Sequence, residues 1–386
     1  MIKLDQYLSD YIIIGSLLLI MINMPVFAQN QPAINDTLNS FDIGSDKQIT
    51  FRIYAPEADS VSLHRGDIPQ SKVDGEMEIN KKGIWTTTTK PLEPGAYRYR
   101  FVVDGLSVLD PCNPATSESN MNSWSLFYVS GSEEMDTKDV PHGMVAELPY
   151  YSKTLKSFRR MHVYTPPGYE SGNDKFPIFY LLHGAWDSDD AWTTVGRAGF
   201  IFDNLIAQNK IEPMVVIMPD GHTGPFYAGK KFNMDEFVND FNNEIMPLAE
   251  SRYRIKGNRE NRAIAGLSMG GAQTLNIIIN NLDKFGYIGV FSSGIFGITG
   301  DRRFTDQDGP SWEERHLKTL TSDAKNGIEL FWFGIGKDDF LLETSDATVK
   351  MLEKHDFDIV YKKTAGGHTW LNWRDYLIEF SQLLYR

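Results

Sequence analysis

The periodicity of hydrophobic and polar positions differs between two regions of the chain. Over residues 41–130, apolar residues recur at every second position, as in Phe51-Arg52-Ile53-Tyr54 and Tyr97-Arg98-Tyr99-Arg100. This period is typical of strands with one face in a core and the other toward solvent. Asp104-Gly105 follows the second run and favours a tight hairpin turn. Short strands at this spacing predict a β-sandwich over residues 41–130.

Residues 145–386 alternate apolar runs with segments of helical spacing. The expected strands are 145–148, 159–164, 177–182, 214–218, 263–265, 290–294, 330–335 and 359–361. Helical spacing is clearest over residues 235–253, where Phe237, Phe241 and Ile245 share one face. Strands that alternate with helices predict a mostly parallel sheet with helices on both faces.

The amino-terminal segment has the pattern of a secretory signal peptide. Lys3 precedes the apolar run Ile12–Met24, and small residues end at Ala28. The run is shorter than the roughly 20 residues that span a bilayer, so we expect cleavage after Ala28, export to the periplasm or the medium, and no membrane association afterwards. Residues 29–40 and 131–144 are polar and are predicted to be linkers.

Length, charge and cysteine content narrow the possible functions. A chain of 386 residues is longer than one core usually fills, so two domains are expected. The net charge of −13 argues against nucleic acid or an anionic membrane as a partner. The single cysteine, Cys112, cannot form an intramolecular disulfide. No Cys/His spacing suits zinc, and neither a metal nor a cofactor is predicted.

The pattern Gly266-Leu267-Ser268-Met269-Gly270 predicts a nucleophile elbow. An apolar strand precedes it and a helix-compatible run follows. A serine on such a strand-to-helix turn presents its hydroxyl at the sheet edge, and glycines let the backbone crowd around it. The alternative is a glycine-rich turn with a solvated serine. We expect Ser268 to be the nucleophile and the Met269 N–H to be one donor of an oxyanion hole.

The loop after strand 177–182 is the expected source of the second oxyanion donor. It reads His183-Gly184-Ala185-Trp186, and the Ala185 N–H takes this role. His183 itself is interpreted as structural, as are His142 and His162. Nearby Asp187, Asp189 and Asp190 are interpreted as a solvated charged loop, with cation binding as the alternative. The candidate substrate-binding residues are Trp186, Asp220, Trp312 and Trp370; for Asp220 and the adjacent His222, turn formation is an equal alternative.

Two further strand ends supply an acid and a base. Gly336-Lys337-Asp338-Asp339 follows strand 330–335, and Gly366-Gly367-His368 follows the last strand. The resulting order Ser, Asp, His belongs to the α/β-hydrolase fold. His368 would accept the serine proton, and an aspartate would orient the imidazole. Asp339 is the predicted triad acid, and Asp338 is kept as the alternative.

The amino-terminal region resembles a known module. Phe51-Arg52-Ile53-Tyr54-Ala55-Pro56, Gly83-Ile84-Trp85 and Gly95-Ala96-Tyr97-Arg98-Tyr99 are similar to early-set immunoglobulin-like domains related to carbohydrate-binding family 48. The resemblance implies a module that precedes a glycan-active domain. Trp85 and Trp124 are expected to pack in the core or at a domain interface rather than to stack on sugar.

The carboxy-terminal region resembles carbohydrate esterase family 1, the feruloyl and acetylxylan esterases. The likeness rests on His183-Gly184, Ala265-Gly266-Leu267-Ser268-Met269-Gly270-Gly271, Gly336-Lys337-Asp338-Asp339 and Gly366-Gly367-His368-Thr369-Trp370. It implies a serine esterase that acts on feruloylated xylan or arabinoxylan, with acetylxylan esterase as the first alternative. A siderophore esterase and a non-catalytic glycan-binding protein are the further alternatives.

Overall fold

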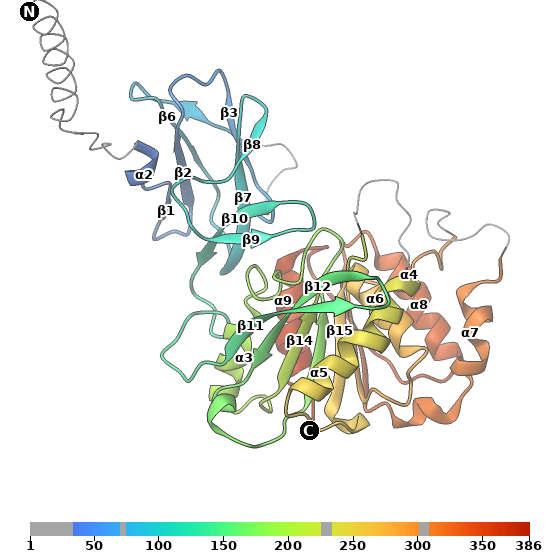
Figure 1. Cartoon of the computed structure of the whole chain (residues 1–386). Helices are drawn as coiled ribbons and strands as arrows, with labels where there is room; N and C mark the ends of the chain where they lie inside the picture. Colours follow the sequence, from blue (N-terminus) through green and yellow to red (C-terminus); the bar gives the residue numbers. More distant parts are fainter. Residues whose placement is uncertain (1–33, 70–74, 225–233, 301–308) are drawn as a thin grey trace, which may run out of the picture.

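The computed structural model describes residues 34–69, 75–224, 234–300 and 309–386. The predicted signal peptide, residues 1–28, lies outside these ranges. The described chain forms a smaller all-β lobe and a larger lobe built on one eight-stranded sheet (Figure 1).

The smaller lobe is a sandwich of two antiparallel sheets, called the β-sandwich below. One sheet has the order β1-β2-β6-β5, and the other has the order β4-β3-β7-β10-β9 with β8 beside β7. Its strands are β1 (Phe41–Ile43), β2 (Ile49–Tyr54), β3 (Val61–His64), β4 (Gly75–Glu76), β5 (Glu78–Ile79), β6 (Ile84–Thr88), β7 (Gly95–Val103), β8 (Leu106–Val108), β9 (Thr116–Glu118) and β10 (Ser123–Val129). Phe51, Tyr99 and Phe127 form an aromatic centre, with ring centroids 4.7 to 5.6 Å apart. The alternation in the sequence therefore corresponds to the face of each sheet that packs in the sandwich core, although β7 is buried on both faces over Gly95–Phe101.

Both segments predicted as linkers make specific contacts where they are described. The short helix α2 (Ile34–Thr37) is held to β2 by two hydrogen bonds between Asn35 and the backbone of Tyr54, at 2.9 and 3.0 Å. In the second segment Met135 is buried, and the Asn204 side chain donates to the carbonyl oxygens of Glu134 and Asp136. Residues 131–144 therefore pack against the larger lobe.

The larger lobe has a mixed sheet with the order β11-β12-β14-β13-β15-β16-β17-β18. The strands are β11 (Met144–Ser152), β12 (Ser157–Thr165), β13 (Ile178–Leu182), β14 (Val215–Pro219), β15 (Arg262–Leu267), β16 (Tyr287–Phe291), β17 (Leu330–Gly336) and β18 (Val360–Thr364). The pairs from β14 to β18 are parallel, whereas β11 and β12 are antiparallel. Every residue of β15 is buried, as expected for a central parallel strand covered on both faces.

Helices cover both faces of this sheet (Figure 1). One face packs against α4 (Met234–Asp240), α5 (Met246–Arg252), α6 (Met269–Ile278) and α8 (Leu342–Lys354), and the other against α3 (Ala198–Ala207) and α9 (Trp370–Ser381). A π-helical turn at Phe241–Ile245 joins α4 to α5. It ends just before Pro247, which has no N–H for a regular helical bond. The predicted class, an α/β-hydrolase lobe preceded by a β-sandwich, is confirmed. None of the helices in the described ranges is both long and apolar enough to cross a bilayer.

The central strand should dominate the stability of the larger lobe. Ile264 on β15 is 0% exposed, whereas Val360 on the edge strand β18 is 47% exposed. Ile264→Ala leaves a cavity in a packed core and should lower the free energy of unfolding by about 2–5 kcal/mol. Val360→Ala should change it by less than about 1 kcal/mol, because little area is lost from the core. Urea denaturation of the two variants measures the difference. Equal losses of unfolding free energy would contradict the placement of β15 at the centre and β18 at the edge of the sheet.

Candidate active site

Ser268 stands on a sharp turn between β15 and α6. Its φ of 51° and ψ of −115° lie in a region that residues with a side chain rarely adopt. A Cβ at Gly266 would come within 2.3 Å of the Gly270 backbone, and one at Gly270 within 2.6 Å of the His183 carbonyl oxygen. The turn therefore requires glycine at both positions, and it carries the serine hydroxyl to the carboxyl edge of the sheet.

Ser268, His368 and Asp339 form a continuous hydrogen-bonded chain. His368 Nε2 lies 2.9 Å from Ser268 Oγ. His368 Nδ1 lies 3.0 Å from both carboxylate oxygens of Asp339. Asp339 is buried, whereas Asp338 is exposed. Of the two adjacent aspartates, Asp339 is the one that contacts the imidazole.

Neighbouring groups restrain the imidazole and its carboxylate. Phe340 packs on the His368 ring at 4.4 Å, and the Trp373 ring meets it edge-on at 5.0 Å. The Leu341 N–H donates to Asp339 Oδ1 at 2.9 Å. In the tautomer with the proton on Nδ1, His368 donates to Asp339 and leaves Nε2 to accept the serine proton.

Backbone donors lie on both sides of the serine. The Met269 N–H begins α6 and has no partner within the helix. Ala185 lies in a turn closed by a 3.2 Å bond from the Asp187 N–H to the Gly184 carbonyl. The buried His183 ring supports this turn, because Nδ1 contacts the Gly184 carbonyl and Nε2 accepts from the Gly221 N–H, both at 2.8 Å.

A cavity of about 370 Å³ opens at Ser268, with walls from both lobes. The larger lobe contributes Ala185, Trp186, Trp370 and Trp373, together with His368. The β-sandwich contributes the loop after β3, residues 66–69, and Arg98 from β7. Trp186 is 58% exposed, whereas Trp370 is buried. Two of the four predicted substrate-binding residues therefore lie at this cavity, and the contribution from the β-sandwich was not predicted.

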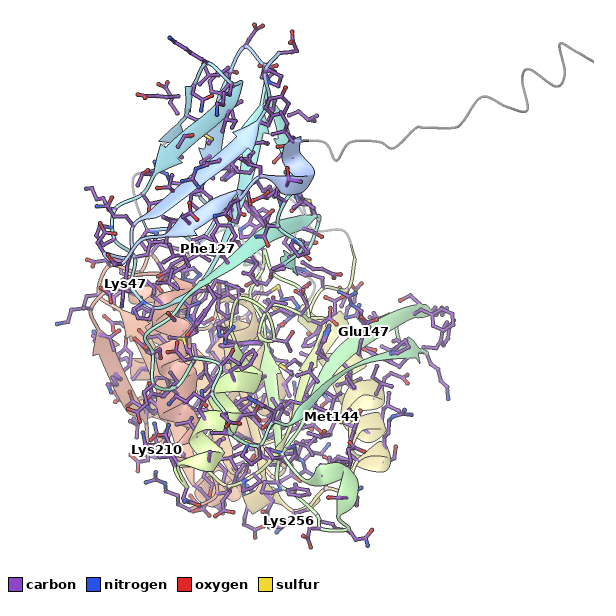
Figure 2. All side chains as sticks on the ribbon, turned by 90° about the vertical axis from the view of Figure 1, so that its left-hand side faces the viewer. Lys47, Phe127, Met144, Glu147, Lys210 and Lys256 are labelled. Carbon is purple, nitrogen blue, oxygen red and sulfur yellow. The ribbon has the colours of Figure 1, made fainter. Side chains whose placement is uncertain are left out.

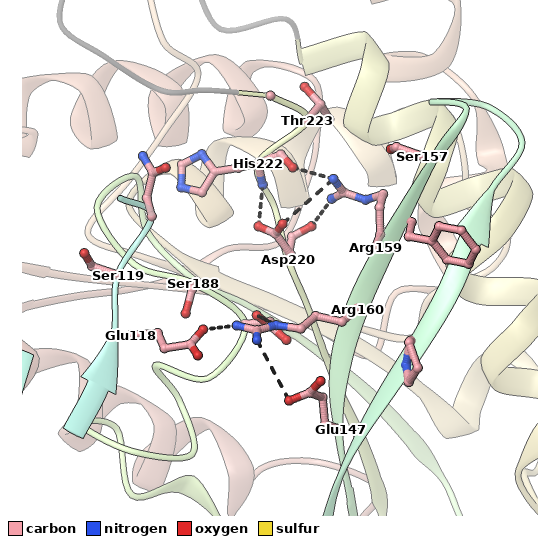
Figure 3. A pocket seen from close by; sticks show the side chains of 15 residues that line it. Glu118, Ser119, Glu147, Ser157, Arg159, Arg160, Ser188, Asp220, His222 and Thr223 are labelled. Atoms are coloured by element: carbon pink, nitrogen blue, oxygen red, sulfur yellow. Dashed lines mark hydrogen bonds and ion pairs between the residues drawn. The ribbon is translucent and has the colours of Figure 1, made fainter. Parts of the chain in front are cut away.

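The other two predicted substrate-binding residues lie elsewhere. Trp312 begins α7 (Trp312–Leu320), and its indole N–H donates to Asn276 of α6 at 3.0 Å. Asp220 borders a second cavity, of about 720 Å³, between the β11–β12 hairpin and the β-sandwich (Figure 3). Figure 2 shows this hairpin projecting from the side of the larger lobe, with Glu147 along it.

Asp220 is held in this second cavity by its neighbours. Burial raises its pKa, but His183 and Arg159 outweigh this and lower it to about 2. Burial lowers the pKa of the adjacent His222 to about 4, so its ring is neutral at pH 7. The Asp220 carboxylate also accepts from the His222 N–H at 3.0 Å, and this hydrogen bond orders the loop after β14.

The interpretation of Asp187, Asp189 and Asp190 as a solvated loop is wrong. They are 4%, 2% and 8% exposed. Asp187 accepts from Arg98 at 2.8 Å and Asp190 from the Glu118 N–H at 2.9 Å. Asp189 contacts Arg160 and His162, each at 2.9 Å. Buried carboxylates need such partners, and all four of these partners come from the β-sandwich or from β12. Among the described residues, no three metal-ligating side chains form a cluster.

The remaining candidates have packing partners. His142 contacts Asp203 at 2.8 Å. Trp85 is buried and donates to the Ala55 carbonyl at 2.8 Å. Trp124 is half-buried under the guanidinium of Arg100, which lies 3.6 Å from its ring centroid.

One arginine is sealed between the lobes. Arg374 of α9 is 1% exposed and donates to the carbonyl oxygens of Ala96 and Val195 at 2.9 and 3.0 Å. A Cβ at Gly95 would lie 2.5 Å from its Nη2. The two lobes therefore fit closely around this side chain.

Comparison with known proteins identifies the family. A family model described as "Putative esterase" matches residues 152–384, more than half of the chain. The chain belongs to this esterase family. A second model, carbohydrate-binding module 48 (isoamylase N-terminal domain), matches residues 40–113 of this esterase-family chain. The resemblances drawn from the sequence are confirmed.

Curated relatives of this family member include named esterases. The endo-1,4-β-xylanase/feruloyl esterase of Xylanibacter ruminicola is 32% identical over 265 residues, which cover 66% of this chain and 36% of the relative. The match to endo-1,4-β-xylanase Y of Acetivibrio thermocellus spans 13% of that protein. The acetyl esterase of Caldicellulosiruptor saccharolyticus is 25% identical over 60% of this chain and 95% of the relative.

Solved structures support the fold of the family member. A ferulic acid esterase of Anaeromyces mucronatus, in complex with ferulic acid, has a TM-score of 0.58 and 24% identity, and covers 66% of this chain and 96% of that one. Enterochelin esterase of Shigella flexneri has a TM-score of 0.62 and 17% identity, and covers 89% and 94%. At these identities the likeness concerns the fold alone.

Proposed function

We propose that this esterase-family chain is a serine carboxylic-ester hydrolase. The observation that carries the proposal is the hydrogen-bonded chain Ser268–His368–Asp339 on a strained elbow. Ser268 Oγ attacks the ester carbonyl while His368 Nε2 takes its proton, and the imidazolium then protonates the leaving alcohol. Water, deprotonated by the same imidazole, releases the acid from the acyl-enzyme. The N–H groups of Ala185 and Met269 stabilise the oxyanion in both steps.

The proposed substrate is a feruloyl ester on xylan, arabinoxylan or derived oligosaccharides. The X. ruminicola relative, named in part as a feruloyl esterase, supports this choice. The cavity at Ser268 also suits a planar aromatic acid, because three tryptophan side chains contribute to its wall. We further propose that the protein is exported after cleavage behind Ala28. The exported form should therefore have Gln29 as its first residue, which its intact mass would reveal.

A second candidate is an acetylxylan esterase, which the acetyl esterase relative favours. The fold likeness to enterochelin esterase keeps a siderophore ester as a third candidate. A glycan-binding protein without activity is the alternative from another class, because a fold does not determine activity.

A substrate panel with serine labelling tests these candidates. Purified protein is assayed on methyl ferulate, acetylated xylan and a catecholate siderophore ester, and is treated with a fluorophosphonate. We expect the highest kcat/KM on methyl ferulate and labelling that Ser268→Ala prevents. Faster turnover of acetylated xylan would support the second candidate. Xylan affinity without labelling would contradict an esterase.

A further inference from the structure

The turn that carries Ala185 is bound along its outer side by the β-sandwich. Ser119, in the loop after β9, forms an antiparallel bridge with Asp187. The next residue, Asn120, donates its backbone N–H to the Trp186 carbonyl at 3.5 Å and its side-chain N–H to the Ala185 carbonyl at 3.4 Å. These bonds are long, so they guide the turn without fixing it strongly.

Arg98 of β7 supplies the short contact to the same turn. Its Nη1 donates to Asp187 at 2.8 Å, while Nε and Nη2 donate to the two oxygens of Asp67 at 2.6 and 3.0 Å. Burial lowers the pKa of Arg98, but the two carboxylates outweigh burial and raise it above its usual value, so the side chain stays charged. A guanidinium fork held by one carboxylate presents its remaining N–H in a fixed direction.

Asp187 connects this fork to the backbone around Ala185. Its carboxylate is buried and accepts from Arg98, and its own N–H closes the turn on the Gly184 carbonyl. Only Ala185 and Trp186 lie between Gly184 and Asp187, so fixing Asp187 also restricts the direction of the Ala185 N–H. An oxyanion donor is effective only when it is already aimed at the position where the charge develops.

We propose that Arg98 is a positioning residue that holds the Ala185 N–H on the oxyanion through Asp187. The β-sandwich thereby completes the active site of the larger lobe, in addition to any contact with a polysaccharide. This inference rests on the proposed function, because it concerns the oxyanion of an acyl transfer.

Kinetics of Arg98 variants provide the first test. Arg98→Met should lower kcat for methyl ferulate by about 10–100-fold, and should weaken binding of a trifluoromethyl ketone by a similar factor, because a misplaced donor loses most of its effect on the oxyanion. KM should change less than about threefold, since the ground-state ester uses the hole weakly. Arg98→Lys keeps the charge but loses the fork, so its kcat should fall between those of Arg98→Met and the wild type. Arg52→Met, which removes an exposed pair with Asp42 on the same sandwich, is the matched control and should match the wild type.

A second variant separates positioning from folding. Arg98→Met leaves the Asp187 carboxylate buried without its cation, which lowers stability for any role of the pair. The double variant Arg98→Met/Asp187→Asn removes the buried charge of Asp187 but leaves Asp67 without the guanidinium, so it should regain part of the lost Tm but not kcat. Recovery of kcat in the double variant, or an unchanged kcat in Arg98→Met, would overturn the proposal.

Hydrogen exchange tests the positioning without any substrate. In Arg98→Met, the amides of residues 184–187 should exchange about tenfold faster or more, because the turn opens locally. Unchanged exchange in this peptide would overturn the inference, even for an active esterase. If the wild type fails to hydrolyse esters while exchange in Arg98→Met still accelerates, the proposed function is wrong. Arg98 then still holds the turn of residues 184–187 in place.

Discussion

Ser268→Ala should lower kcat for methyl ferulate by about 10⁶-fold, leaving only the catalysis that binding and the oxyanion donors provide. The serine oxygen is the only group of the hydrogen-bonded chain that forms a covalent bond with the acyl carbon in the proposed mechanism. KM should stay within about threefold, because the substitution removes an atom that acts in the transition state rather than in binding. Initial rates and electrospray detection of the acyl-enzyme provide the measurement.

Folding of this variant is the first control. Alanine at position 268 meets the same strained backbone as serine, so Tm should change by no more than a few degrees, corresponding to about 1 kcal/mol. Ser171→Ala, at an exposed serine in the same lobe, is the matched substitution and should keep full activity. Activity of Ser268→Ala above about 1% of the wild type would rule out the acyl-enzyme at this residue.

Asp339→Asn should lower kcat by about 10⁴-fold while the fold is retained. The carboxylate accepts the His368 Nδ1 proton through both oxygens. An amide that presents its N–H₂ to Nδ1 favours the opposite tautomer, whose Nε2 carries a proton and cannot take one from Ser268. The pH–rate profile and kcat of the purified variant provide the measurement.

The neighbouring aspartate offers a matched control at almost the same place in the chain. Asp338 is exposed, and its backbone N–H, rather than its side chain, is bonded to the Gly366 carbonyl at 2.9 Å. Asp338→Asn should therefore keep kcat within about threefold of the wild type, as a surface substitution away from the reacting groups. A larger loss from Asp338→Asn than from Asp339→Asn would reverse the assignment of the triad acid.

Local sequence patterns were sufficient for the parts of the site that lie on single strand ends. The elbow depends on glycines within two residues of Ser268, and the order of the loops follows from parallel strands whose carboxyl ends share one edge. The sequence favoured Asp339 as the triad acid but left Asp338 as an alternative. Their difference in burial arises from the path of the chain after β17, which no local pattern records.

Contacts between the lobes were beyond the reach of periodicity. The alternation around Arg98 predicted a solvent-facing side chain, yet Arg98 is 8% exposed, because the larger lobe covers that face of β7. Its partner Asp187 is 89 residues away in the chain. The charge of Asp187 suggested a solvated loop, because a buried ion pair can be recognised only when the positions of both partners in the fold are known.

Two predicted substrate-binding residues illustrate a different limit. Asp220 does follow a strand at the expected edge, but its carboxylate contacts Arg159 and His183, and Asp220 does not line the Ser268 cavity. Trp312 instead donates its indole N–H to Asn276 of α6 and does not line the Ser268 cavity. The direction in which a loop side chain points depends on such tertiary contacts.

The sealed Arg374 also has a consequence for biosynthesis. Its hydrogen bond to the Ala96 carbonyl joins residues 278 positions apart, so this part of the seam between the lobes can form only after residue 374 has been synthesised, whereas the contact between Arg98 and Asp187 can form earlier. Because Gly95 leaves no room for a side chain beside Arg374, a module transplanted from another protein would need this glycine. Recombination is thus expected to transmit the two lobes as one inherited block.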